Sequence, residues 1–309
     1  MKIFSGLFTL FLCAYLFIAV GLAHGASKLA KVTITSGSAS ERDGVPYVAQ
    51  DLGLFKKHGL DLTFVQVRNG PVAMSALSSG ETQFHWGSVS GANLGAIAEG
   101  ADLVFIAGFI NRLSGMFVVN SQIKTPAELK GKSIAVNSLS GGWIFSMLML
   151  DYWGLVPERD KIQFRTLGDQ AVMAQGVLTG SADGAFLGYT FGNMLRGKGF
   201  RVLADSEKLP IPYQGSGVIA RRSFMVSSPA IVDGVLRALL ESSTFIRNPE
   251  SKMQVMKSLA KALRFRRIEE AEEGYHSMVN LYEKKFIPLS KVFATSSVCS
   301  GPITKRSAD

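Results

Sequence analysis

The sequence predicts an α/β protein with two similar lobes, each containing a mainly parallel sheet flanked by helices, with a ligand cleft between them. Strand-like and helix-like periods alternate along the chain, which is typical of parallel sheets covered by helices. The order of elements then recurs about one hundred residues later. The length of 309 residues and a hydrophobic content of 47% suffice for two well-packed units.

The first 25 residues predict a secretory signal peptide. Lys2 is their only Lys or Arg, an apolar run covers 7–22, and small residues surround the expected cleavage point after Ala23 or Gly25. The apolar run is shorter than the ~20 residues of a spanning helix, which disfavours the alternative of an uncleaved anchor. The mature chain would retain only Cys299, so it forms no internal disulfide. A soluble protein of a bacterial periplasm fits these features best.

The charge balance favours an anionic ligand. Lys and Arg number 33 against 24 Asp and Glu, which gives a formal net charge of +9. The bases are dispersed, and the densest runs, at 221–222 and 264–267, are interpreted as solvated helix ends. Together with export, this dispersion argues against nucleic acid as a partner. A mild preference for anions is the expectation that remains.

Periodicity assigns the elements of the first half of the chain. In the segment after Gly44, Val45, Val48, Ala49 and Leu52 form one apolar face of a helix, and Gly59 suits a left-handed helix end. The expected strands are 31–34, 60–67, 83–86 and 103–107. The expected helices are 44–58, 71–79 and a segment ending near 99.

The second half repeats this plan. Gly180 ends a helix as Gly80 does, and Phe186 takes the place of Trp86. The expected strands are 116–119, 133–136, 162–167, 182–187 and 201–204, and the expected helices lie near 126–129, 144–152 and 172–178 and after 188. A further strand is expected at 215–221, followed by helices at 229–245, 249–263 and 268–282 that pack back on the first lobe.

Small polar residues follow the predicted strands where ligands bind in open parallel sheets, beyond the carboxyl ends. The four clusters are Ser36–Ser40, Gly87–Gly91, Ser138–Gly142 and Gly188–Thr190. Gly permits close approach to the backbone, and Ser and Thr supply donors. The alternative is that these residues are ordinary helix caps.

Several larger side chains lie beside these clusters. Trp86, Trp143 and Tyr189 could form walls of a cleft or pack at the sheet edge, and Tyr47 has the same two interpretations. Arg112 could contact an anion or lie on the surface. His58 is interpreted as a helix-end cation and His85 as structural, and His276 lies in the predicted helical tail. No hydrolase, phosphate-loop or paired-cysteine motif occurs. We therefore expect no catalytic residue, no cofactor and no metal.

Four segments resemble one family. They are PYVAQDLGLFKKHGLDL at 46–62, ALSSGE at 76–81, IKTPAELKGK at 123–132 followed by IAV, and LTGSAD at 178–183. They resemble solute-binding proteins of ABC importers in the nitrate, sulfonate, taurine and thiamine-precursor group. The resemblance covers about residues 31–250.

The resemblance implies a type II periplasmic-binding-protein fold. One lobe would comprise 26–112 and 214–285, the other 113–213, and 286–309 would be a poorly structured tail. A monomer would capture a small anionic molecule and deliver it to an inner-membrane permease that is powered by a cytoplasmic ATPase. The ligand-binding candidates are Ser36, Ser38, Trp86, Ser88, Ser90, Arg112, Ser138, Ser140, Gly141, Trp143, Asp183 and Tyr189.

Two other functions stay open at this point. The first is an enzyme on the same fold that acts on a pyrimidine or a small carboxylate. The related pyrimidine-forming enzyme carries a Cys-rich motif and an essential His, which this chain lacks. The second is a ligand-sensing partner of a membrane receptor, which would use the same clamp. The ligand itself could be a sulfonate, nitrate, a carboxylate or an aromatic compound.

Overall fold

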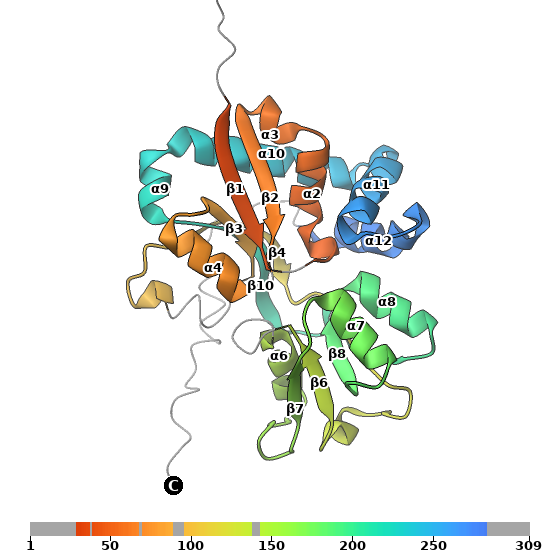
Figure 1. Ribbon diagram of the computed structural model, residues 1–309. Helices are drawn as coiled ribbons and strands as arrows, with labels where there is room; N and C mark the ends of the chain where they lie inside the picture. Colours follow the sequence, from red (N-terminus) through yellow and green to blue (C-terminus); the bar gives the residue numbers. More distant parts are fainter. Residues whose placement is uncertain (1–28, 38, 68–69, 89–95, 138–142, 283–309) are drawn as a thin grey trace, which may run out of the picture.

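The computed structural model describes residues 29–37, 39–67, 70–88, 96–137 and 143–282. The predicted signal peptide and the predicted tail at 286–309 lie outside these residues, as do Ser38, Ser90, Ser138, Ser140 and Gly141. Two sheets lie one above the other in Figure 1, each covered by helices. No helix in the described part of the chain has the length and apolarity required to cross a membrane.

The first sheet has five strands in the order β2 (Leu60–Gln66), β1 (Ala30–Ser36), β3 (Phe84–Gly87), β10 (Pro212–Ala220) and β4 (Val104–Arg112). β1 pairs parallel with β2 and β3, whereas β10 runs antiparallel to β3 and β4. The sheet is therefore mainly parallel, as predicted. Its one antiparallel strand comes from far along the chain.

The second sheet has the equivalent order, β7 (Gln163–Thr166), β6 (Ser133–Val136), β8 (Gly184–Leu187), β5 (Met116–Val119) and β9 (Arg201–Asp205). β6 pairs parallel with β7 and β8, and β5 runs antiparallel to β8 and β9. The chain enters this sheet between Arg112 and Met116 and leaves it between Asp205 and Pro212. Two short crossings thus join the sheets.

Helices from both ends of the chain cover the first sheet (Figure 1). They are α2 (Gly44–Asp51), α3 (Leu54–Lys57), α4 (Gly70–Ser79), α9 (Arg222–Ser227), α10 (Pro229–Arg247), α11 (Lys252–Leu263) and α12 (Glu272–Leu281). α10 and α11 pack on α2. The second sheet carries α6 (Ile144–Tyr152), α7 (Gln170–Leu178) and α8 (Tyr189–Gly197). α12 also contacts α8, so the C-terminal helices touch both lobes.

Short 3-10 turns complete the fold: η1 (Glu41–Asp43), η2 (Pro126–Leu129), η3 (Ser206–Lys208), η4 (Pro249–Ser251) and η5 (Ile268–Ala271). The single helix predicted over 44–58 is in fact two, because Gly53 adopts a left-handed φ of 66° between α2 and α3. A left-handed residue interrupts the helical hydrogen-bond ladder, and glycine adopts it without steric cost. The periodicity of the apolar face did not reveal this break.

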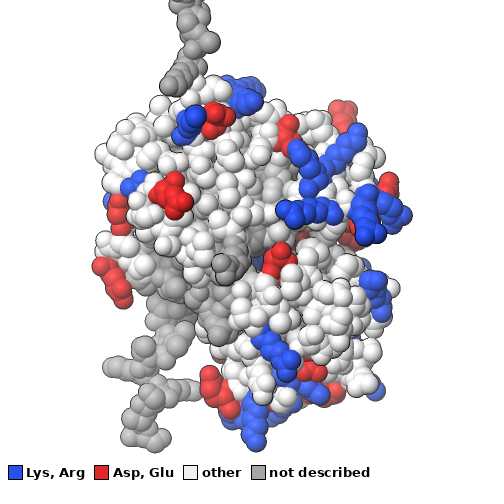
Figure 2. All heavy atoms as spheres, in the orientation of Figure 1, with Lys and Arg blue, Asp and Glu red and all other residues white. Residues whose placement is uncertain are grey.

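The core is continuous between the lobes. One cluster of buried side chains includes Ile34 and Trp86 from the first lobe together with Met173 and Leu187 from the second. The basic runs lie outside it, and Arg264, Arg266 and Arg267 are exposed. Figure 2 shows Lys and Arg gathered over the region of α11 and α12 on the face drawn. The sequence-based interpretation of the 264–267 run as a solvated helix end is confirmed.

Candidate functional site

A cavity of about 370 Å³ lies between the two sheets. This volume falls within the range of about 300–1,000 Å³ that is usual for small-molecule sites. The first lobe lines it with Ser36, Arg42, Asp43, His85, Trp86 and Ser88. The second lobe lines it with Asn137, Phe145, Gln170, Met173 and Phe186. The strand ends of both sheets therefore meet at one shared cavity, as parallel topology predicts.

The turn η1 presents the charged residues of the cavity. The Ser40 side chain accepts a hydrogen bond from the backbone N–H of Arg42 at 3.3 Å, and the Asp43 carboxylate accepts from the backbone N–H of Ser40 at 3.2 Å. These reciprocal contacts form a capping box. Asp43 also accepts a hydrogen bond from the Ser36 hydroxyl at 3.0 Å. The end of β1 and the turn are thereby fixed to each other.

Arg42 is the cationic group of the cavity. Its side chain lies over the ring of Phe145, 4.9 Å from the centroid, so it reaches from the first lobe to the second. Arg42 is only 8% exposed, and none of the described residues forms an ion pair with it. A buried guanidinium without a carboxylate partner is costly unless an anion supplies one. Its planar donors suit carboxylate, sulfonate or phosphate oxygens.

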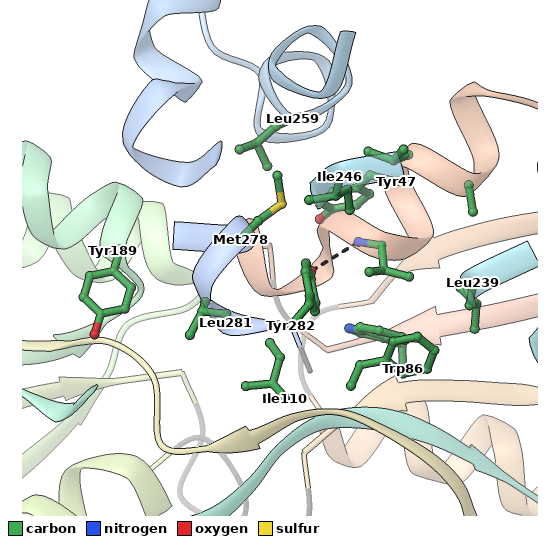
Figure 3. Close-up of a cluster of buried hydrophobic side chains, with 14 of the residues drawn as sticks. Tyr47, Trp86, Ile110, Tyr189, Leu239, Ile246, Leu259, Met278, Leu281 and Tyr282 are labelled. Carbon is green, nitrogen blue, oxygen red and sulfur yellow. Dashed lines mark hydrogen bonds between the residues drawn. The ribbon is translucent and has the colours of Figure 1, made fainter. Parts of the chain in front are cut away.

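Two buried side chains hold the backbone of η1 in place. The Tyr282 hydroxyl lies 3.1 Å from the carbonyl oxygens of both Glu41 and Arg42, and it accepts from the backbone N–H of Val45 at 3.2 Å. The indole N–H of Trp86 donates to the Arg42 carbonyl at 3.2 Å. Figure 3 shows Tyr282 and Trp86 within the buried cluster. Burial raises the pKa of the Tyr282 phenol, which stays protonated as a donor.

Glu41 connects the lobes on the other side of η1. Its fully buried carboxylate accepts a hydrogen bond from the backbone N–H of Tyr189, the first residue of α8, at 2.7 Å. A carboxylate at a helix amino end is electrostatically favourable. Gly188 allows this approach, because a Cβ there would lie 2.5 Å from Oε1 of Glu41. The structure therefore shows the two lobes in contact around the cavity.

His85 is a second polar group of the lining. It is 3% exposed, and its Nδ1 lies 3.0 Å from the carbonyl oxygen of Thr35 on the neighbouring strand. Burial lowers the pKa of His85 to about 4, and the hydrogen bond to Thr35 opposes this shift. The imidazole is therefore neutral near pH 7. The sequence alone suggested a structural role only.

The structure brings together three of the predicted site residues. Ser36, Trp86 and Ser88 line the cavity at the carboxyl ends of β1 and β3. Trp86 also packs against Phe109, with ring centroids 5.0 Å apart. Its ring thus serves both the wall and the core, which joins the two interpretations that the sequence left open.

Four predicted residues lie outside the described cavity lining: Trp143, Tyr189, Arg112 and Asp183. Trp143 packs near Phe164. Tyr189 donates its hydroxyl to Asp205, and burial, followed by this hydrogen bond, raises the pKa of the Tyr189 phenol. Tyr189 belongs to the same buried cluster as Trp86 and Tyr282, at the left of the view in Figure 3. The exposed Arg112 donates to the carbonyl of Asn280 at 3.1 Å, so its surface interpretation holds.

Asp183 differs from the expectation for a topological reason. It immediately precedes β8, so it lies at the amino end of that strand, whereas the cavity lies at the carboxyl end. Its carboxylate accepts from the backbone N–H of Ser133 at 2.8 Å and from the Ser133 hydroxyl at 2.9 Å. Asp183 therefore joins β6 to β8. The segment 183–189 contributes to the cavity through Phe186 instead.

The main residues that sequence reasoning missed are Arg42, Phe145 and His85. Arg42 follows the predicted Ser-rich loop by two residues, so a cation directly after a strand-end loop was the available signal. Phe145 lies on the first turn of α6 and could be read only as a core residue. Their meeting depends on the relative placement of the lobes, which local patterns do not specify.

Comparison with known sequences assigns this chain to a protein family. The family model described as NMT1/THI5 like matches residues 44–252, which is well over half of the chain. The chain belongs to the NMT1/THI5-like family. The resemblance predicted from four sequence segments is therefore confirmed. The match includes β2 to β10 and most of the helical covering of the first sheet.

Individual relatives agree with this family. A protein of Brucella abortus (strain 2308) is 27% identical over 235 residues, which cover 74% of this chain and 70% of that protein. The taurine-binding periplasmic protein of Escherichia coli (strain K12) is 23% identical over 262 residues, covering 82% and 79%. The alkanesulfonate-binding protein SsuA from Xanthomonas axonopodis pv. citri, solved with MOPS, matches in structure with a TM-score of 0.72 and 21% identity. That match covers 89% of this chain and 92% of SsuA. The predicted periplasmic-binding-protein fold is thus confirmed.

Proposed function

We propose that this protein is the solute-binding component of an ABC importer and that it captures a small organic anion between its lobes. The buried Arg42 guanidinium in the cavity carries this proposal, because within the described residues it has no anionic partner. Binding an anion would supply the missing charge. Family membership and the similarity to taurine- and alkanesulfonate-binding proteins support the same class of function.

The arrangement of the cavity supports a closing mechanism. Arg42 belongs to the first lobe, and Phe145 and Phe186 belong to the second. A ligand held by Arg42 would contact these rings only when the lobes approach. Ligand binding then favours the closed form, because only that form makes both sets of contacts. The closed form would be the one that docks on a membrane permease.

The cellular setting forms part of the proposal. The predicted signal peptide and the similarity to a periplasmic protein support export to a bacterial periplasm, where we expect a monomer. A permease with a cytoplasmic ATPase would be the partner. Expression in a Gram-negative host followed by cell fractionation and N-terminal sequencing tests the location. We expect a mature chain that begins after Ala23 or Gly25; full-length protein in the cytoplasm would contradict it.

Thermal unfolding with a panel of anions tests the binding function. At one hundred times Kd, a ligand adds about 2.7 kcal/mol to the free energy of unfolding. For a protein of this size, Tm should then rise by at least about 2 °C. The panel contains sulfonates, carboxylates, nitrate and a pyrimidine, and small-angle scattering of each complex checks for lobe closure. Unchanged Tm with every anion would refute the proposal, and turnover of a compound would favour the enzyme.

A further inference from the structure

His85 has one ring nitrogen engaged and one left for the cavity. Nδ1 faces the Thr35 carbonyl oxygen at 3.0 Å, and a carbonyl can only accept a hydrogen bond. Nδ1 must therefore carry the hydrogen, and in a neutral imidazole Nε2 then carries a lone pair. No described residue hydrogen-bonds to Nε2, although His85 is 97% buried and lines the cavity.

The imidazole lies over Gly87, towards the end of β3 where the cavity is. A Cβ on Gly87 would lie only 2.2 Å from Nε2 of His85 and 2.9 Å from Cδ2. Any other residue at 87 would displace the ring. The glycine thus keeps open the position in which Nε2 faces the carboxyl end of the strand.

The second sheet shows that the fold does not require a histidine here. Thr35 pairs with His85 in the first sheet, and Ala135 pairs with Ala185 at the equivalent position of the second. The place of Gly87 is taken by Leu187. Ala185 and Leu187 occupy this face of β8 in the second sheet, and His85 and Gly87 occupy the same face of β3 in the first. The histidine is therefore a feature of the ligand-facing side and not of the shared architecture.

We propose that Nε2 of His85 accepts a hydrogen bond from the ligand, so that the ligand is a small organic anion carrying a hydroxyl or amino donor. This inference rests on the proposed function, which assigns the anionic group to Arg42. The Asp43 carboxylate lines the same cavity and also favours a donor. A ligand without a donor would leave the buried acceptor at His85 unsatisfied, so nitrate and simple alkanesulfonates are disfavoured.

Calorimetry with a matched pair of sulfonates tests the inference. Isethionate and ethanesulfonate share a two-carbon chain and the same anionic group, and only isethionate carries a hydroxyl. We expect isethionate to bind about tenfold more tightly, since an unsatisfied buried acceptor carries such a penalty. His85→Ala, which copies the second sheet, should bring the ratio of the two Kd values to about one. His85→Gln, which retains an acceptor, should restore part of the preference.

The outcomes separate this inference from the proposed function. Binding of both sulfonates with equal Kd in the wild type, or a ratio unchanged in His85→Ala, would overturn the role of His85 while leaving anion capture intact. Failure of every anion to bind would contradict the proposed function. Nitrogen-15 NMR of the ligand-free protein independently measures which ring nitrogen of His85 is protonated. We expect Nδ1 protonated and Nε2 with a lone pair, and a protonated Nε2 would overturn the inference.

Discussion

The two sheets share one backbone plan but differ at the ends of their strands. Thr33 pairs with Thr63 in the first sheet, and Ser133 pairs with Gln163 in the second, a constant offset of one hundred in numbering. Left-handed residues recur in step at Gly53 and Gly154, at Gly80 and Gly180, and at Gly100 and Gly199. The repeat recognised in the sequence is thus a repeat of register and of turn geometry.

The difference lies in which lobe brings charged side chains to the cavity. The first lobe presents Arg42, Asp43 and His85 to the cavity, and the second presents mainly Phe145, Met173 and Phe186. Equivalent frameworks therefore carry different chemistry. The shared fold therefore determines where the strand ends lie, and the side chains at those ends determine the chemistry of the cavity.

Arg42→Met should have the largest effect on binding. Removing a buried guanidinium that contacts an anion should weaken affinity about 100-fold or more, in the range of buried charge-pair losses of about 2–5 kcal/mol. The free protein should lose little stability, because among the described residues the guanidinium contacts only the Phe145 ring and the Ser40 hydroxyl and forms no ion pair. Calorimetry and thermal unfolding measure both quantities. The matched control is Arg112→Met, whose exposed side chain lies outside the cavity lining; equal losses in both would refute this assignment.

Acidification should destabilise the first lobe through His85. Its folded pKa of about 4 lies below the ordinary value of 6.5, so below pH 6.5 the unfolded chain binds the proton more readily. Stability is therefore lost as pH falls from 6.5 to 4, by up to about 3 kcal/mol. Arg42 and Asp43 are the charged groups that share the cavity. His85→Ala should show a smaller loss between pH 7 and 4 in denaturant titrations, and parallel pH profiles would contradict this.

Tyr282→Phe should loosen the turn that carries Arg42. The variant removes the hydroxyl that accepts from Val45 and lies next to the carbonyls of Glu41 and Arg42. Leaving these buried groups unsatisfied should cost about 1–3 kcal/mol of unfolding free energy. Anion affinity should fall as well, since Arg42 loses its support. Tyr152→Phe is the control, because Tyr152 is 48% exposed, and it should change neither quantity.

Asp183→Ala and Gln83→Ala compare the same contact in the two sheets. Asp183 accepts from the N–H and hydroxyl of Ser133, and Gln83 accepts from the N–H of Thr33 at 2.9 Å. The charged acceptor should be the stronger, so we expect a loss of about 1–3 kcal/mol for Asp183 and about 1 kcal/mol for Gln83. Urea unfolding measures the difference. Anion affinity should be unchanged in both variants. A loss of binding in Asp183→Ala alone would indicate that Asp183 contacts the ligand after all.

Lys161→Gly should give the smallest effect. Lys161 has a left-handed φ of 55° two residues before β7, and Gly59 has a φ of 78° immediately before β2. Relief of the steric cost of about 1–2 kcal/mol is partly offset by the greater freedom of glycine in the unfolded chain. We expect a gain of less than about 1 kcal/mol and, for Gly59→Ala, a loss of about that size. A destabilised Lys161→Gly would show that the lysine side chain itself contributes.

Local patterns predicted most of the fold. β5 and β6 have the predicted bounds, and β1, β2 and α10 lie within about three residues of them. Such segments follow from side-chain period and from end residues, both of which act over a few positions. The break at Gly53 was missed because the apolar face continues up to the break and the residues after it still match a helix C-terminus. The antiparallel direction of β5 and β10 depends on how the chain crosses between sheets.

The sequence by itself determined the two-lobed α/β architecture, the family and the strand ends at which Ser36, Trp86 and Ser88 lie. Only the tertiary structure decided that Arg42, Phe145 and His85 share one cavity with them. The physical reason is the distance along the chain between the residues that determine each feature. Hydrophobic period is a property of neighbouring residues, whereas the cavity is made by residues more than one hundred positions apart that meet when two sheets pack. The same packing places other candidates, such as Asp183, away from the described cavity lining.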